Sequence, residues 1–307
     1  MSKSSLCLIF SACVLVAQEA RLSGPVSGFV FDGEAKALRP VLGVPGSAHL
    51  GNPLSTGGDA AVVAGSVALV ARSEGVVLLR GLEAASPEAV AIEGSMAGAI
   101  LFAFADDGAS AAVYSASRRQ VQVIRDLAKS PVAGTPVDVA LDAVSVLAFD
   151  GEHMVAGAAG GVWLLTDGAP KRLVEVAHPA DLEIHGRDLF VADRDGNRIW
   201  QVLDFAAAAT PLVFADERSG ILSPAGIEVL NGRLVVASAA ARAVDAFELA
   251  THTLASHVDL DFTPTRLEAL GRQGLAVLNS PGEAEPLWVL DAGERFGVYF
   301  VPAGREE

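Results

Sequence analysis

Three glutamates occupy the same place in three successive apolar segments of the chain. They are Glu183 in Leu-Glu-Ile, Glu228 in Ile-Glu-Val and Glu268 in Leu-Glu-Ala. Carboxyl groups that converge raise one another's pKa, and in ionised form they supply the oxygen ligands that hard divalent cations prefer. If these segments lie side by side, we therefore predict a divalent-cation site or an acid/base group. The alternative is that each glutamate is solvated or accepts a hydrogen bond from a neighbouring backbone N–H.

The remaining motifs complete no catalytic site. The run from Asp193 to Asp204 has the oxygen spacing of a calcium loop, but Arg198 stands where that loop requires glycine, which favours a plain β-turn. The six histidines lack metal-ligand spacing, and there is no Gly-x-Ser-x-Gly elbow or phosphate-binding glycine loop. We therefore predict no catalytic residues and no cofactor, and a divalent cation at the three glutamates is the one exception left open.

The segments that would position the glutamates belong to a repeat. A short apolar strand, a polar or glycine turn and a second apolar strand recur about every forty residues. The turns are marked by Asp32, Arg72, Ser115, Gly157, Asp193, Ser238 and Asn279. A single small sheet cannot bury both of its faces, so it must stack on its neighbours. This period is typical of the four-stranded blades of a β-propeller, in which the first strand of each blade lines a central channel.

The predicted fold class is therefore all-β, with a single β-propeller of four-stranded antiparallel blades over residues 21–307. The first unit is incomplete, because Gly28 to Phe31 and Leu38 to Leu42 fit second and third strands and no convincing first strand precedes them. The spacing of the turns favours seven blades, the first being three-stranded or completed by the N-terminus. Six blades with an extra hairpin packed outside the ring are the alternative.

One unit resembles a known repeat. The segment Asp188-Leu-Phe-Val-Ala-Asp193-Arg-Asp-Gly-Asn197-Arg-Ile199 is similar to the NHL-repeat signature, in which a strand ending in aspartate precedes an Asn-Arg hairpin. The other units diverge from it, with Ser115, Gly157 and Ser238 in place of the aspartate. The resemblance implies a bladed propeller of the type found in secreted bacterial proteins. It assigns no activity, because such families include protein-binding scaffolds, lyases and lactonases.

The first twenty residues predict a secretory signal peptide. Lys3 precedes an apolar stretch from Leu6 to Val16, which is too short to span a bilayer, and cleavage is expected near residues 17–20. A periplasmic or extracellular location follows, and the lipoprotein alternative is less favoured. Both cysteines lie inside this segment, so the mature domain has no disulfide.

The charge balance limits the partners that are expected. The chain has 22 Lys and Arg against 37 Asp and Glu, a net charge of −15, which repels nucleic acid and anionic membrane surfaces. We predict a monomer, without membrane insertion of the mature chain, that binds an unknown protein or small ligand. The favoured function is a non-enzymatic binding or scaffold domain acting through its loop face and channel. The alternative is a lactonase-like metal-dependent hydrolase or a lyase that uses the channel glutamates.

Overall fold

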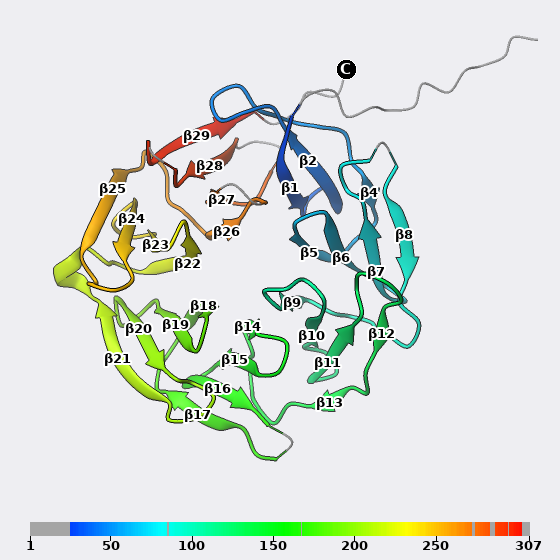
Figure 1. The fold of residues 1–307 in the computed structure, drawn as a ribbon, viewed down its shortest axis with the longest axis horizontal. Helices are drawn as coiled ribbons and strands as arrows, with labels where there is room; N and C mark the ends of the chain where they lie inside the picture. The colour runs from blue at the N-terminus through cyan, green and yellow to red at the C-terminus, as the bar shows by residue number, and fades with distance from the viewer. Residues whose placement is uncertain are drawn as a thin grey trace, which may run out of the picture.

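The chain folds into seven small antiparallel sheets arranged around a central axis (Figure 1). The computed structural model describes residues 25–84, 86–166, 168–271, 274–282, 286–293 and 295–302. Each sheet is one blade and is built from a continuous part of the chain, so no described strand is exchanged between blades. The prediction of an all-β propeller with seven blades is confirmed, and the six-bladed alternative is wrong.

The strands follow one another outward from the channel within each blade. Blade one contains β1 (Val26–Asp32), β2 (Ala37–Leu42), β3 (His49–Leu50) and β4 (Ser55–Thr56). Blade two contains β5 (Ala60–Ala64), β6 (Val67–Arg72), β7 (Gly75–Arg80) and β8 (Glu88–Ala91). Blade three contains β9 (Leu101–Phe104), β10 (Ala111–Ser115), β11 (Gln120–Arg125), β12 (Val132–Ala133) and β13 (Val137–Asp138). Blade four contains β14 (Val146–Phe149), β15 (Met154–Ala158), β16 (Gly161–Leu165) and β17 (Lys171–Val174). Blade five contains β18 (Pro179–His185), β19 (Asp188–Asp193), β20 (Arg198–Leu203) and β21 (Thr210–Ala215). Blade six contains β22 (Pro224–Leu230), β23 (Arg233–Ser238), β24 (Ala243–Glu248) and β25 (Leu254–Asp259). Blade seven contains β26 (Glu268–Ala269), β27 (Leu275–Val277), β28 (Leu287–Asp291) and β29 (Gly297–Val301).

Blade five shows how the sequence forms this unit. Leu189, Val191 and their neighbours give β19 the β-branched and apolar content of a buried strand. The chain then reverses because Asp193 Oδ1 accepts the backbone N–H of Gly196 at 2.9 Å, and Asn197 adopts a positive φ of 50°. A side chain at position 196 would overlap the carboxyl group of Asp193, which would have to shift to make room. The hairpin expected from the Asp-Gly-Asn sequence is therefore present.

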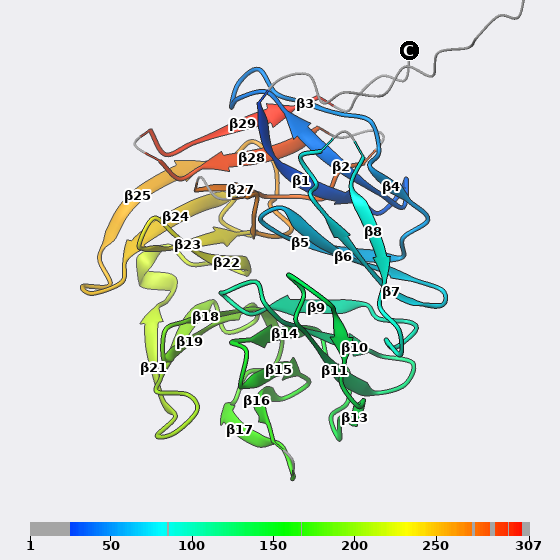
Figure 2. The same cartoon turned by 45° about the vertical axis from the view of Figure 1, so that its right-hand side comes forward.

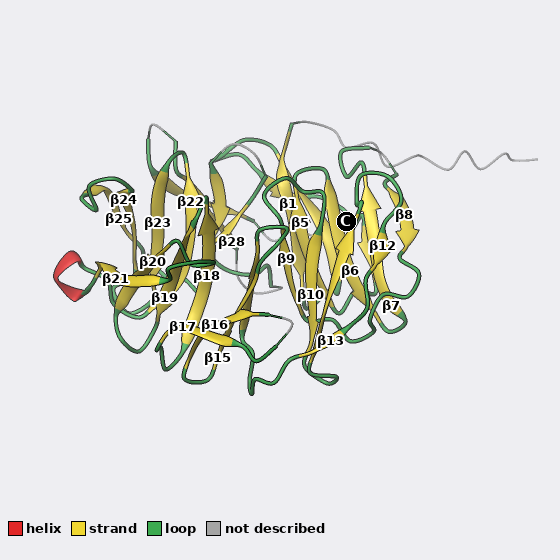
Figure 3. Ribbon diagram, turned by 60° about the horizontal axis from the view of Figure 1, so that its bottom comes forward, coloured by secondary structure: helices red, strands yellow, loops and turns green. Residues whose placement is uncertain are grey.

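The hydrophobic core is divided between the blades. Seven apolar clusters are found in the described residues, and each lies between two adjacent blades. The ring closes in the same way, because Val30 and Val41 of blade one pack against Leu270, Val277 and Val289 of blade seven. Burial of apolar side chains between sheets therefore holds the ring together. The two views in Figures 2 and 3 show the sheets stacked face to face around the axis.

Two blades depart from the regular arrangement. In blade three the outer position is shared by β12 and β13, which both pair with β11. In blade one β3 and β4 both pair with β2, so its four strands occupy only three positions. β1 and β2 correspond to second and third strands, since Asp32 Oδ1 accepts the N–H of Ala35 as Asp193 accepts that of Gly196. Within residues 25–84, blade one thus fills three strand positions.

The N-terminal segment lies outside the described residues. The predicted signal peptide of residues 1–20 and its cleavage near residues 17–20 consequently stay predictions. Among the residues that the structure describes, no helix is long and apolar enough to cross a membrane. The part of the chain that the structure describes contains one 3-10 helix, η1 (Glu217–Ser219), in the connection between blades five and six.

Candidate functional site

The three predicted glutamates all lie on innermost strands. Glu183 is on β18, Glu228 on β22 and Glu268 on β26, and these strands face the centre of the ring (Figure 1). Their placement along the channel wall follows from the repeat, because each occupies the inner strand of its blade. The three side chains nevertheless have different surroundings and partners.

Glu183 and Glu228 come together, and Glu268 does not join them. The first two line a cavity of about 200 Å³ in the channel, together with Asp106 from the turn after β9. Residues of the inner strands β9, β14 and β18 form most of the rest of its wall. Glu183 and Glu228 are poorly solvated here, and burial raises the pKa of both.

Glu268 is instead paired with a cation. Its carboxylate forms an ion pair with the guanidinium of Arg266, which stands two residues earlier in the chain. Burial lowers the pKa of Arg266, and the charge of Asp181 acts in the opposite direction. Arg266 therefore places a positive charge beside one of the three predicted glutamates.

A fourth carboxyl group, Asp181, stands next to the predicted set on β18. Its Oδ2 accepts the backbone N–H of Ile227 in the next blade at 2.9 Å, and its Oδ1 accepts the N–H of Leu182 at 2.9 Å. Burial raises the pKa of Asp181 to about 7, although both N–H groups and the charge of Arg266 act to lower it. Burial therefore favours the protonated form of Asp181, while its two oxygens accept bonds from two blades.

Glu183 makes the same kind of link. Its Oε1 accepts the backbone N–H of Val229 in blade six at 3.4 Å. Burial raises the pKa of Glu183 well above its ordinary value, and the nearby carboxyl groups of Glu228, Asp181 and Asp106 add to the rise. Glu183 is thus held by the neighbouring blade and surrounded by groups of the same charge.

Glu228 repeats this relationship one blade further on. Burial raises the pKa of Glu228 to about 8, and the carboxyl groups of Asp181 and Asp106 raise it further. The backbone N–H of Ala269 on β26 hydrogen-bonds to it and acts to lower the pKa. The alternative considered from the sequence, in which a glutamate binds a neighbouring backbone N–H, therefore describes Glu183 and Glu228. We call Asp181, Glu183 and Glu228 the channel carboxyls.

The channel carboxyls do not form a ready cation site in this geometry. Within the described ranges, no group of three or more His, Cys, Asp or Glu side chains is placed to hold a metal ion. Binding a divalent cation at Glu183 and Glu228 would first require both carboxyl groups to lose protons that their surroundings favour. The site predicted at Glu183, Glu228 and Glu268 stays a prediction.

Asp181, Asp106 and Arg266 were not predicted as site residues from the sequence. Two of them carried a local signal, because Asp181 precedes Glu183 and Arg266 precedes Glu268 by two residues, the period of a strand face. Asp106 carried none, since it lies in a turn of blade three and reaches the cavity only through the closure of the ring.

The loop face of blades five and six contains a second group of polar residues. Asn197 in the β19–β20 turn donates from Nδ2 to Glu217 Oε1 at 2.6 Å, and its Oδ1 accepts the N–H of Ser223 at 2.7 Å. The intervening turn is closed by Asp216 Oδ1, which accepts the N–H of Arg218 at 2.9 Å, and by Gly220 with a φ of 88°. The connection from 216 to 223 is therefore fixed to the neighbouring hairpin by side-chain bonds.

The calcium-loop oxygens have other partners. Asp195 binds the His178 ring, and Asp204 accepts from Arg187 at 2.7 Å. Asp193 Oδ2 accepts Trp200 Nε1 at 3.3 Å. These oxygens diverge toward different neighbours, so the segment is a hairpin turn, as Arg198 at its sixth position predicts.

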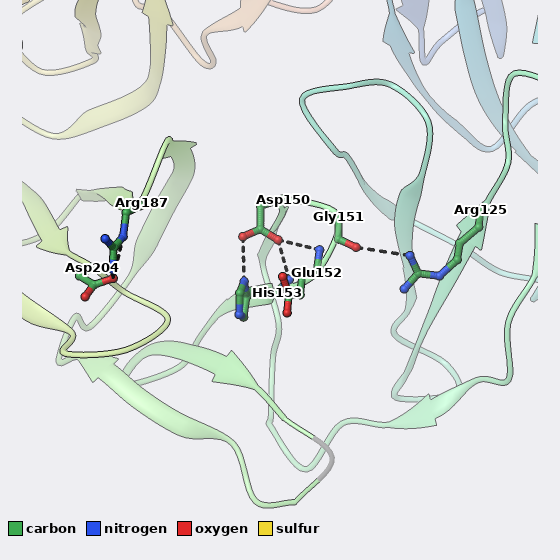
Figure 4. A network of polar contacts seen from close by, with 7 residues as sticks. All are labelled: Arg125, Asp150, Gly151, Glu152, His153, Arg187 and Asp204. Carbon is green, nitrogen blue, oxygen red and sulfur yellow. Dashed lines mark hydrogen bonds and ion pairs between the residues drawn. The ribbon is translucent and has the colours of Figure 1, made fainter.

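The opposite face carries the polar network of Figure 4. Asp150 accepts the backbone N–H groups of Glu152 and His153, at 2.8 and 2.5 Å, and its Oδ2 lies 2.9 Å from His153 Nδ1. Burial acts to raise the pKa of Asp150, but these three contacts and the charge of His153 outweigh it and lower the pKa. Arg125 of blade three donates to the carbonyl of Gly151 at 3.4 Å. The network closes the β14–β15 turn and links it to blade three.

Comparisons with known proteins support the fold and no more. No family model matches the sequence, and neither does any curated protein. Among solved structures, a protein of unknown function from Desulfotomaculum acetoxidans is similar over 90% of this chain and 99% of its own, with a TM-score of 0.64 and 14% identity. U3-55K is similar over 79% of this chain and 80% of its own, with a TM-score of 0.57 and 16% identity. Hsv2 from Kluyveromyces lactis covers 76% of this chain and 73% of its own, with a TM-score of 0.55 and 12% identity.

Proposed function

We propose that this protein is a non-enzymatic binding domain that recognises a protein partner with the loop face of its propeller. The observation that carries the proposal is the fixed connection between blades five and six. Asn197 holds both Glu217 and Ser223, so the loop has lost most of its freedom before any partner arrives. A surface that is ordered in advance pays less conformational entropy on binding.

The same loops present suitable recognition groups. Arg194, Asp195 and Arg218 are exposed around the Asn197 network, and Leu222 beside them is 37% exposed. Charged side chains around an exposed apolar residue provide both orientation and contact area. The channel carboxyls, in contrast, are occupied in holding adjacent blades, which supports a structural role for the channel wall.

We further propose that the domain is exported and belongs with NHL-like propellers. Export rests on the N-terminal charge, apolar stretch and small residues, and it places the partner in the periplasm or outside the cell. The NHL-like assignment rests on Asp193, the aspartate of the signature. Its carboxylate accepts hydrogen bonds from the Gly196 N–H and from Trp200 Nε1, which stabilises the hairpin.

Site-specific photo-crosslinking in cells of the source organism tests the binding proposal. A benzophenone amino acid at Arg218 is expected to give a discrete adduct of higher mass after illumination. The matched control places it at Val132, which is 56% exposed on an outer strand of blade three, and is expected to give none. Equal labelling at both positions, or none at Arg218, would contradict a specific loop-face partner.

A second function is favoured by one observation, the raised pKa values of Glu183 and Glu228. A carboxyl group that keeps its proton near neutral pH can act as a general acid, which fits the lactonase-like or lyase alternative. Incubation of the purified protein with lactones and with Ca²⁺, Mg²⁺, Mn²⁺ or Zn²⁺ distinguishes a binding domain from such an enzyme. We expect no turnover, whereas turnover that is lost in Glu228→Gln would establish the enzyme.

A further inference from the structure

Four blades fix their connections to the next blade in the same way. In blades one, three, five and six, the turn between the second and third strand positions has four residues, and its last residue has a φ between 49° and 55°. These last residues are Lys36, Arg119, Asn197 and Arg242. Each of their side chains binds the connection to the next blade, as Lys36 Nζ does at 2.8 Å from Asp59 Oδ1. In these four blades a polar side chain therefore fills the space between turn and connection.

Blade two departs from this arrangement. Its corresponding turn has two residues, Ser73 and Glu74, and neither has a positive φ. A cavity of about 510 Å³ is lined by this turn with its flanks, residues 72–77, and by the start of the connection to blade three, residues 91–95. Ligand sites in proteins typically have volumes of about 300–1,000 Å³. The short turn thus leaves room for a small ligand where the other four blades have a side chain.

Arg72 supplies this cavity with a positive charge that has no acidic partner. Its Nη2 donates to Ser55 Oγ at 3.0 Å. Within the described ranges the guanidinium forms no ion pair, and its buried Nε has no hydrogen-bond acceptor. A buried donor of this kind usually bonds to a water molecule or an anion that the chain itself does not supply. Arg72 is therefore suited to bind the carboxylate of a ligand.

Two carboxylates and two apolar side chains line the same cavity. Glu74 and Glu93 are both exposed, and neither forms an ion pair with another described residue. They would repel a ligand that is only anionic, so a ligand that reaches Arg72 must also carry a cationic group. Val77 and Ile92 add apolar surface, and Ile92 is buried. A ligand that matches these groups has a carboxylate, a cation and an aliphatic chain between them.

We propose that the cavity of blade two binds a lysine or arginine residue with a free α-carboxylate, either as a free amino acid or as the C-terminus of a peptide. Arg72 binds the carboxylate, and Glu74 and Glu93 bind the cationic end of the side chain. The aliphatic part of that side chain packs on the apolar lining. The net charge of −15 attracts a basic ligand to this surface. The site is independent of the partner proposed at blades five and six, because it uses residues of blade two and its connection to blade three.

Calorimetric titration of the purified protein with four ligands tests the chemistry. The ligands are acetyl-glycyl-lysine with a free carboxylate, its C-terminal amide, acetyl-glycyl-norleucine with a free carboxylate, and L-lysine. We expect the lysine peptide acid to bind at least about tenfold more tightly than its amide, and about threefold or more tightly than the norleucine peptide. Binding of L-lysine as tight as that of the peptide acid would identify a free amino acid as the ligand, whereas weaker binding would identify a peptide C-terminus. Both results support the site.

Matched variants assign the binding to this cavity. Arg72→Gln is expected to weaken binding of the peptide acid about tenfold or more, whereas Arg118→Gln, which removes an exposed arginine from the corresponding turn of blade three, should leave it unchanged. Glu93→Gln should weaken it about threefold, and Glu88→Gln, on the outer strand of blade two, should not. If Arg72→Gln does not fold, the two glutamate variants decide, since Glu93 is exposed. Equal affinity for the acid and the amide, equal affinity within either pair of variants, or no binding at about 10 mM peptide would overturn the proposal.

Discussion

The carboxyl group of Asp181 on β18 accepts the backbone N–H of Ile227 on β22 at 2.9 Å, so a side chain of blade five binds the main chain of blade six. Glu183 does the same to Val229, and Glu228 is bound by the N–H of Ala269 in blade seven. These links give the inner strands hydrogen-bond partners that a neighbouring sheet strand would otherwise supply. The acidic channel wall is therefore explained by the connection of blades.

Removal of the Asp181 carboxyl group tests this link. Asp181→Ala leaves the N–H groups of Ile227 and Leu182 without their acceptor, and we expect a loss of about 1–3 kcal/mol in the free energy of unfolding. Asp181→Asn keeps one acceptor oxygen and should lose clearly less. Urea unfolding measures both. Equal stability of the alanine variant and the parent protein would show that the bond contributes nothing.

The pH dependence of stability follows from the raised pKa values. Asp181 and Glu228 keep their protons in the folded protein up to a pKa of about 7 and about 8, whereas the unfolded chain releases them near pH 4. Between these limits the folded state binds more protons, so the free energy of unfolding falls as the pH rises. After allowance for the partial exposure of both side chains, we expect a fall of about 2–4 kcal/mol from about pH 5 to about pH 9.

A paired variant isolates part of this effect. Asp181→Asn with Glu228→Gln removes two of the three channel carboxyls and should reduce the slope of the pH profile, whereas Glu183, whose pKa is also raised by burial, keeps its part of the fall. His257, whose pKa is raised mainly by its bond to Asp245, will leave a smaller fall in the same direction. If the free energy of unfolding falls as steeply with pH in the paired variant as in the parent protein, groups other than Asp181 and Glu228 release the protons.

Gly226 marks a close approach between the inner strands of blades six and seven. A Cβ at this position would overlap the backbone nitrogen of Leu267, which cannot move without shifting β26. We expect Gly226→Ala to lose about 2–4 kcal/mol of stability, as overpacking against backbone does. Gly33→Ala is the control, because nothing lies within 4 Å of the added carbon. Similar melting temperatures for the two variants would contradict the packing.

Gln122 on β11 is a buried polar residue with all of its bonds made. Its Oε1 accepts the N–H of Met96 at 2.8 Å, and its Nε2 donates to the carbonyls of Gly94 and Gly134 at 3.0 and 2.7 Å. Gln122→Leu would leave three backbone groups unpaired, and we expect a loss of about 2–4 kcal/mol by urea unfolding. Gln120→Leu removes only an exposed bond to Asp138 and should change stability by less than about 0.5 kcal/mol.

The sequence predicted the ring because the information is local and repeated. Each hairpin is encoded by its own turn residues, such as Asp193 to Asn197, and each strand by its apolar pattern, so seven copies reinforce one interpretation. The departure of the first unit from the repeat was also readable, since no convincing first strand precedes Gly28 in the repeat pattern.

The site was predicted only in part, because its contacts join different blades. Glu183 and Glu228 were found from their position on inner strands. The ion pair of Glu268 with Arg266 and the approach of Asp106 depend on the register between blades, which bulges such as that between Pro224 and Gly226 set. No spacing within one repeat encodes such a register.

Thermal unfolding of the mature chain with and without divalent cations tests the central account most directly. If the channel carboxyls serve to bind adjacent blades, Ca²⁺, Mg²⁺, Mn²⁺ and Zn²⁺ should each raise the melting temperature by less than about 1 °C at neutral pH. A rise of about 5 °C or more with any one of them, abolished by Glu228→Gln, would contradict the account and establish a cation site in the channel.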